Sequence, residues 1–149
     1  MSDLGLFKGR RVLLTGHTGF KGMWLALLLL RAGAEVTGFA LDAPTEDGTE
    51  ALRRLGILKE LRDVRGDVCE LSALRRAFEE ARPEIVFHLA AQPIVRTSYR
   101  QPVDTFATNV MGTVNLLECV RTSDTVRSVL IVTTDKVYEN KEWAWGYRE

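Results

Sequence analysis

Three glycines spaced three apart offer the first chemistry in this chain. The stretch Thr15–Gly22 reads Thr-Gly-His-Thr-Gly-Phe-Lys-Gly and lies between an apolar run and a helical pattern. Glycines at such a corner let backbone approach a diphosphate closely, and unpaired amides at the helix start favour negative charge. We therefore expect Gly16, Gly19 and Gly22 to hold the phosphates of a dinucleotide. The alternative is an ordinary tight turn between a strand and a helix.

Acidic residues follow the next two predicted strands. Asp42 lies about 20 residues beyond Gly22, where a carboxylate binds ribose hydroxyls and repels a 2′-phosphate. No arginine is near it in the sequence, which favours NAD over NADP, although Asp42 could equally be a solvated turn residue. Asp67, in Gly66-Asp67-Val68, could accept a hydrogen bond from the adenine amine, with the Val68 backbone completing the contact. A helix-initiating turn explains Asp67 almost as well.

Small and reactive residues follow the fourth and fifth predicted strands. Ala90 and Ala91 would let the ribose and nicotinamide lie flat against backbone, or would serve close helix–strand packing instead. Thr134, Asp135 and Lys136 combine a hydroxyl, an acid and an amine. In an open parallel sheet, ligands bind outside the carboxyl ends of the strands, so this triplet is a candidate reactive site. A solvated turn at the strand end is the alternative.

The elements that must position these residues alternate along the chain. Short runs rich in Val, Ile, Leu and Phe predict strands at Arg11–Thr15, Glu35–Leu41, Leu61–Arg65, Ile85–Leu89 and Ser128–Thr133. Helical patterns occupy Lys21–Ala32, Glu46–Leu58, Ser72–Ala81 and Pro102–Arg121. We expect Gly33 to end the first helix in a left-handed conformation, and Ser72 to cap the third. Repeated βα units of this length predict an α/β fold, a Rossmann-type doubly wound, mostly parallel sheet.

Composition excludes several other classes. The 149 residues carry 20 basic and 20 acidic side chains, so no excess charge indicates nucleic acid or an anionic membrane as partner. We expect no export signal and no membrane span, because the apolar run from Met23 to Leu30 is too short. Cys69 and Cys119 have no metal-ligand spacing, and two histidines alone build no metal site. We expect a cytoplasmic protein with reduced cysteines and no metal.

Four segments together resemble a known family. They are Thr15–Gly22, Phe87–Arg96, Thr108–Thr113 and Val132–Asn140, and the last contains Thr-Thr-Asp-Lys-Val-Tyr-Glu-Asn. The glycine loop resembles that of the extended short-chain dehydrogenase/reductases. The whole set is similar to the nucleotide-sugar 4,6-dehydratases, and most of all to the CDP-glucose 4,6-dehydratases. The Ala-Ala-Gln-Pro turn, the Asp-Lys pair and the closing Trp143–Glu149 favour that group.

The resemblance implies a redox-neutral elimination on a nucleotide-sugar, with CDP-glucose as the expected substrate. NAD takes a hydride from sugar C4, water leaves across C5–C6, and the hydride returns to C6. Thr134 would then bond the C4 oxygen, and Asp135 would protonate the departing hydroxyl. Lys136 stands where close relatives have a glutamate base, and as a cation it would instead stabilise the C5 enolate. Cofactor contacts are expected from Gly16, Thr18, Gly19, Phe20, Gly22, Asp42, Asp67, Val68, Leu89, Ala90, Ala91, Gln92 and Thr108.

Two features depart from the family pattern. Ala40 stands where NAD-preferring relatives carry the strand-terminal acid, so Asp42 is displaced by two residues. The Tyr-x-x-x-Lys pair of the superfamily is absent, because Val103 follows Tyr99 by four and Glu142 follows Tyr138 by four. We therefore expect residues 1–149 to be the N-terminal, NAD(P)-binding portion of a longer enzyme.

Other interpretations stay open at this point. The longer enzyme could be an epimerase or reductase of the same superfamily, or the chain could be a non-catalytic dinucleotide-binding module. The stripe Val103, Phe106, Val110, Val114, Leu117 and Val120 on the longest predicted helix, together with Trp143 and Trp145, is a candidate exposed apolar surface. Relatives pair through a helix of this kind, so a homodimer is expected.

Overall fold

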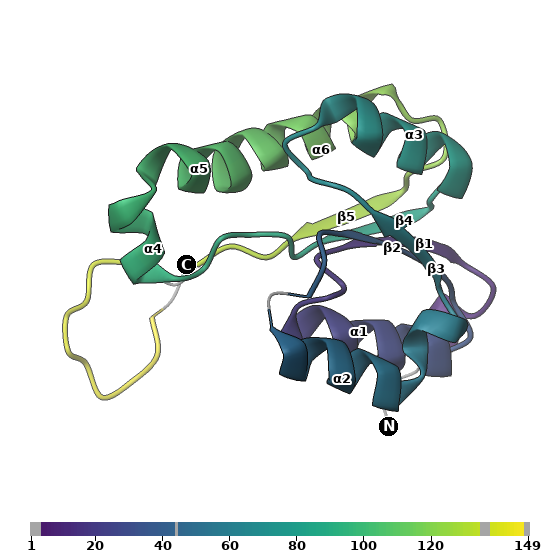
Figure 1. The fold of residues 1–149 in the computed structure, drawn as a ribbon, viewed down its shortest axis with the longest axis horizontal. Helices are drawn as coiled ribbons and strands as arrows, with labels where there is room; N and C mark the ends of the chain where they lie inside the picture. Colours follow the sequence, from purple (N-terminus) through teal and green to yellow (C-terminus); the bar gives the residue numbers. More distant parts are fainter. Residues whose placement is uncertain (1–3, 44, 135–137, 148–149) are drawn as a thin grey trace.

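A five-stranded parallel sheet forms the centre of the computed structural model, which describes residues 4–43, 45–134 and 138–147 (Figure 1). The strands lie in the order β3-β2-β1-β4-β5. Their bounds are Arg11–Thr15 for β1, Glu35–Ala40 for β2, Arg62–Arg65 for β3, Ile85–His88 for β4 and Ser128–Ile131 for β5. The order reverses direction after β3, when the chain crosses over to β4. This topology confirms the predicted doubly wound fold.

Helices cover both faces of the sheet (Figure 1). One face carries α1 (Phe20–Arg31), α2 (Glu46–Leu55) and the 3₁₀ turn η2 (Ile57–Lys59). The other carries α3 (Leu71–Ala81) and a long helical stretch made of α5 (Pro102–Phe106), the π-helical segment η3 (Ala107–Met111) and α6 (Gly112–Thr122). A 3₁₀ turn, η1 (Leu4–Phe7), precedes β1, and α4 (Val95–Arg100) precedes α5.

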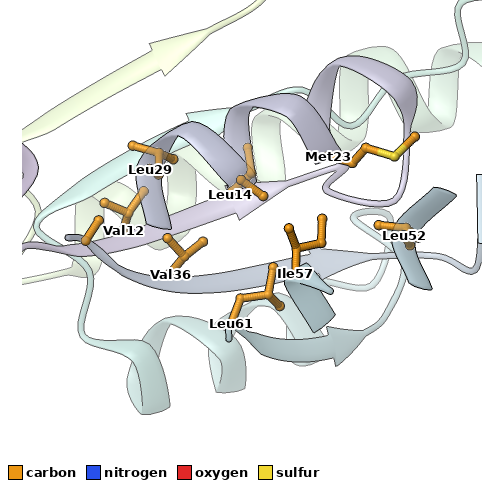
Figure 2. Packing of buried hydrophobic residues seen from close by; sticks show 10 residues of the cluster. Val12, Leu14, Met23, Leu29, Val36, Leu52, Ile57 and Leu61 are labelled. Carbon is orange, nitrogen blue, oxygen red and sulfur yellow. The ribbon is translucent and has the colours of Figure 1, made fainter. Parts of the chain in front are cut away.

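Two apolar layers result from the alternation of side chains along the strands. Val12 and Leu14 of β1 point into the layer under α1 and α2, where they meet Leu29 and Val36 (Figure 2). Leu13, between them in sequence, points into the other layer. That second layer contains Phe39, Leu74, Phe78, Val86 and Leu116, all of them buried. Burial on both faces explains why the central strand β1 is apolar from Val12 to Leu14, whereas the edge strand β3 is charged and largely exposed.

Strand register places the ends of the strands at one edge. Thr15 at the end of β1 pairs with Phe39 of β2 and His88 of β4. His88 in turn pairs with Ile131, and Ala40 pairs with Arg65. The polar segments that follow the strands therefore begin next to one another.

Helix ends agree in part with the sequence-based expectations. Gly33 adopts the expected left-handed conformation with φ of 80°, and its amide donates to the carbonyl of Leu30. Gly56, also left-handed at φ of 69°, ends α2 early and separates it from η2. The expectation that Ser72 caps the third helix was wrong. That helix begins at Leu71, and Glu70 occupies the cap position without a side-chain hydrogen bond.

The region from 95 to 122 differs most from the prediction. The single helix expected over Pro102–Arg121 contains the π-helical segment η3 and extends to Thr122, and α4 was not anticipated. Most of the predicted stripe is exposed, with Val103 at 78%, Phe106 at 68% and Val110 at 47%, whereas Val120 packs against the core. Trp143 and Trp145 are exposed as well. Within the described residues, no helix has the length and apolar character to cross a bilayer.

Candidate functional site

The loop between β1 and α1 is packed too tightly for side chains at two of its glycines. A Cβ on Gly22 would lie 2.0 Å from the carbonyl oxygen of Gly16, and one on Gly16 would lie 2.8 Å from the amide nitrogen of Ala90. Gly16 also has φ of 76°, a conformation that favours glycine. The loop therefore folds back on itself and against the end of β4.

The third glycine has more room around it. A Cβ on Gly19 would meet only the carbonyl oxygen of Gly16, at 3.4 Å. Gly19 is the N-cap of α1, makes no side-chain cap, and is followed by a first turn without acidic residues. The first amides of a helix have no partner within the helix, so they remain able to bind an anion. A diphosphate group fits this combination of bare backbone, open approach and positive potential.

Buried side chains anchor the loop to β2 and β3. His17 is 0% exposed, and its Nε2 lies 2.9 Å from Oδ1 of Asp63. Its ring packs on Gly38, where a Cβ would lie 2.5 Å from the ring. Burial lowers the pKa of His17, so the neutral ring donates from Nε2 to the Asp63 carboxylate. The Thr18 hydroxyl donates to the carbonyl of Leu41 at 3.0 Å.

The end of β2 differs from expectation in one respect. The Asp42 side chain is 95% exposed, as a ligand-facing or a solvated carboxylate would be. However, Nη1 of Arg65 lies 3.4 Å from Asp42 and donates to the carbonyl of Leu41, so an arginine that is distant in the sequence lies near Asp42 in space. Arg65 also donates to Asp63 at 2.8 Å. Its charge is thus held between two carboxylates.

The turn after β3 is ordered by its own side chain. Oδ1 of Asp67 accepts from the amide of Cys69 at 2.8 Å, which is the helix-initiating turn left open as an alternative. Val68 is buried, and Thr108 of η3 places its hydroxyl 3.9 Å from Sγ of Cys69. Nδ2 of Asn115 donates to the carbonyls of Val68 and Cys69. The Asp67–Cys69 turn is therefore attached to the long helix.

Hydrogen bonds also hold the turn after β4. The Thr15 hydroxyl lies 3.2 Å from the amides of both Leu89 and Ala90. The amide of Gln92 donates to Oδ1 of Asn109 at 2.8 Å, and Nδ2 of Asn109 donates back to the Gln92 carbonyl at 3.1 Å. Ala91, between these contacts, is exposed. The turn thus presents small residues on a backbone that hydrogen bonds hold in place.

The predicted reactive triplet is described only in part. Thr134 is exposed and follows β5 at the same edge of the sheet. Asp135 and Lys136 lie outside the described residues. Within the described part of the chain, no group of three His, Cys, Asp or Glu side chains is placed to hold a metal ion.

One edge of the sheet thus collects the glycine loop with Phe20, the Leu41–Asp42 segment, the Asp67–Val68 turn, the Leu89–Gln92 turn and Thr134. The sequence analysis gave no role to five residues that hold these segments: His17, Asp63, Arg65, Asn109 and Asn115. Asn109 lies in the segment Thr108–Thr113, which carries part of the family resemblance, but no role was predicted for it. The signal that could have identified His17 was Gly38 in β2, because a glycine there leaves room for the histidine ring.

The loop geometry predicts opposite outcomes for two glycine substitutions. Gly22→Ala forces a methyl group onto backbone, so it should lower the free energy of unfolding by more than about 3 kcal/mol. Gly19→Ala meets no such obstacle and should cost less than about 1 kcal/mol. Its methyl group would nevertheless occupy the phosphate approach and weaken ADP binding at least about tenfold. Denaturant unfolding and calorimetric titration with ADP measure both effects. Unchanged ADP affinity in Gly19→Ala would contradict a phosphate site at this loop.

Comparison with known proteins agrees with this geometry. The family model described as GDP-mannose 4,6 dehydratase matches residues 13–143. The chain is 52% identical over its whole length to a CDP-glucose 4,6-dehydratase of Salmonella typhimurium, of which it covers 41%. It is 33% identical over 89% of its length to a CDP-paratose 2-epimerase of Salmonella typhi, of which it covers 39%. The chain therefore spans about two fifths of the length of these curated relatives.

Solved structures show the same fold. An epimerase of Methanothermobacter thermautotrophicus superposes with a TM-score of 0.83 at 26% identity, over 99% of this chain and 42% of the other. A Thermus thermophilus UDP-glucose 4-epimerase, solved in complex with NAD, superposes with a TM-score of 0.68 at 34% identity, over 79% of this chain and 36% of that one. With its glycine corner, its parallel sheet and a family match over most of its length, this chain belongs to the GDP-mannose 4,6 dehydratase family.

Proposed function

We propose that this chain is the N-terminal, cofactor-binding portion of an enzyme that converts CDP-glucose to a 4-keto-6-deoxy sugar. The observation that carries the proposal is the open glycine corner at Gly19, within a chain that is 52% identical throughout to a CDP-glucose 4,6-dehydratase. The relatives that are epimerases have lower identity, such as the 33% of the CDP-paratose 2-epimerase. Free Cys69 and Cys119 support a cytoplasmic protein.

The residues at the sheet edge suit a nicotinamide dinucleotide. The first amides of α1 would hold its diphosphate, the Asp67–Val68 turn its adenine, and the Leu89–Gln92 turn its nicotinamide ribose. Leu89, Ala90, Thr108 and the Gly16 backbone would line the remaining surface. Bound there, the cofactor would supply the hydride acceptor and donor that a redox-neutral dehydration needs.

Catalytic roles are proposed for the segment after β5. Thr134 would donate a hydrogen bond to the C4 oxygen of the sugar, and Asp135 would protonate the departing C6 hydroxyl. Lys136 would stabilise negative charge on the C5 enolate. A general base for the C4 hydroxyl would come from residues other than Tyr99 and Tyr138, because neither of these is followed by a lysine four positions later.

Isotope transfer tests the reaction. The complete enzyme, given CDP-glucose deuterated at C4, should form a 4-keto product with deuterium at C6, because the same hydride leaves and returns. Mass spectrometry with NMR locates the label. Deuterium retained at C4 of an epimerised sugar would contradict dehydration.

Two comparisons complete this test. Lys136→Ala should lose elimination, whereas the matched variant Lys141→Ala should retain it, because Lys141 pairs with Glu139 and has no predicted role in the reaction. Residues 1–149 alone should form no 4-keto product.

The end of β2 supports NAD in preference to NADP. Asp42 follows β2, where the ribose is predicted to bind, and its carboxylate would repel a 2′-phosphate. Arg65 could attract such a phosphate, but its guanidinium already bonds Asp63 and the Leu41 carbonyl. Freeing it would cost those charge-assisted bonds.

Cofactor preference is measured by titration of residues 1–149 with each dinucleotide. NAD should bind at least about tenfold more tightly than NADP, a difference of about 1.4 kcal/mol. Asp42→Asn should narrow that ratio by weakening repulsion of the phosphate. The control Asp47→Asn, in the first turn of α2, should leave the ratio unchanged. Tighter binding of NADP by the unaltered chain would overturn the preference.

An exposed apolar stripe supports a homodimer. The stripe consists of Val103, Phe106, Val110, Val114 and Leu117, and it lies along the outer side of α5, η3 and α6. Single apolar residues scattered over a surface are ordinary, whereas five on one helical stretch form a contiguous patch of the kind that marks an interaction site. A second copy of the same stripe would cover it.

Sedimentation equilibrium tests the dimer. The unaltered protein should sediment as a dimer and Val110→Lys as a monomer, because a buried lysine without a partner opposes association. Leu28→Lys serves as control, since Leu28 is exposed to 46% and Val110 to 47% but Leu28 lies on α1, across the sheet. A dimer that survives Val110→Lys would exclude this stripe as the interface.

A further inference from the structure

A chain of hydrogen bonds runs from β1 through β4 to α6. Nδ1 of His88 lies 2.7 Å from Oγ1 of Thr15, and Nε2 of His88 lies 3.2 Å from Oγ1 of Thr113. Thr15 is 0% exposed and His88 2%. These groups are polar and lie inside the core, where an unsatisfied donor or acceptor is costly.

Only one arrangement of protons gives every group in this series of hydrogen bonds a partner. The Thr113 hydroxyl donates to the carbonyl of Asn109 at 2.9 Å, so it accepts from Nε2 of His88. The histidine then accepts at Nδ1 from the Thr15 hydroxyl. The hydroxyl oxygen of Thr15 then accepts hydrogen bonds from the backbone amides of Leu89 and Ala90. Burial lowers the pKa of His88, which keeps the ring in the neutral form that this order requires.

The same helix holds the far end of the turn. Asn109 offers its amide oxygen and nitrogen to the backbone of Gln92, as a neighbouring strand would. The Gln92 side chain is fixed in turn, because Nε2 donates to Thr105 and Oε1 accepts from the amide of Ile94. The turn Leu89–Gln92 is thus bonded at both ends to groups outside it.

Local helix geometry supports this contact. Asn109 lies in the π-helical segment η3, and such segments re-aim side chains and occur often at functional sites. Gly112, which begins α6, lies very close to the β3–α3 turn. A Cβ on Gly112 would lie 2.6 Å from Cγ2 of Val68. The helix is therefore fixed in position against the sheet edge.

We propose that His88, Thr113 and Asn109 are positioning residues that hold the Leu89–Gln92 turn ready for the nicotinamide half of the cofactor. The inference rests on the proposed function, which assigns that turn to the nicotinamide ribose. Pre-ordering a loop raises affinity, because binding then costs less conformational entropy. Asn115 does the equivalent for the adenine half, through its bonds to Val68 and Cys69.

Matched variants on one helix test the proposal in residues 1–149. Asn109→Ala should weaken NAD binding about tenfold and leave AMP binding within about twofold, because AMP does not reach the turn. Asn115→Ala should weaken AMP and NAD alike. Thr113→Val should weaken NAD about threefold or more. Thr122→Val should change neither ligand, since the Thr122 hydroxyl makes the same bond to the carbonyl four residues back without serving a histidine.

Amide hydrogen exchange supplies a measurement that needs no cofactor. Exchange at Leu89, Ala90 and Gln92 should quicken at least about tenfold in Asn109→Ala and Thr113→Val but not in Thr122→Val, with thermal unfolding confirming that all variants fold. Unchanged exchange at these amides, or equal loss of NAD and AMP binding in Asn109→Ala, would overturn the proposal. If the unaltered chain binds AMP but not NAD, the nicotinamide role fails. If it binds neither, the proposed function fails as well.

Discussion

The contact of backbone with backbone at the β1–α1 corner is the constraint on which the rest of the site depends. The carbonyl of Gly16 lies where a side chain on Gly22 would have to be, and Gly16 itself lies against the amide of Ala90. This packing brings the start of α1 directly above the ends of β1 and β4. A larger residue at either glycine would move the helix start away from the sheet edge. The positive end of the helix would then no longer face the sheet edge where the cofactor is expected.

Side-chain hydrogen bonds hold the glycine loop from below and from beside it, while Nδ1 of the buried His17 has no hydrogen-bond partner among the described residues. His17 and Asp63 link it to β3, and Thr18 links it to the end of β2. Asp63 also bonds Arg65, so a single carboxylate connects the glycine loop with the place where the ribose is expected. An ion pair of this kind contributes little at an open surface. Here it matters through geometry, because it restrains an arginine that would otherwise be available to a 2′-phosphate.

Sequence patterns predicted the features that depend on residues close together in the chain. They missed the contacts that depend on which residues pair between strands. Strand positions followed from apolar runs, and the left-handed Gly33 followed from the lack of a Cβ. Arg65 escaped notice because its approach to Asp42 results from the pairing of Ala40 with Arg65 across two strands. Ser72 seemed a better cap than Glu70 by propensity, yet packing set the start of α3 one residue before Ser72. The π-helical segment has no signature in composition, since its residues are ordinary helix residues that tertiary contacts displace.

One helical stretch serves both halves of the predicted cofactor site and carries the exposed apolar stripe. Asn109 and Asn115 are six residues apart, about 9 Å along a helix axis, and they reach two different turns of the sheet edge. The inner side of the stretch combines these directed bonds with buried apolar residues such as Leu116, whereas the outer side is apolar and exposed. Because a packed helix moves as a unit, any shift imposed on the outer side would displace both turns together. Holding both turns against one helical stretch requires close contacts on its inner side. Gly112 against Val68 and the two bidentate asparagines meet that requirement.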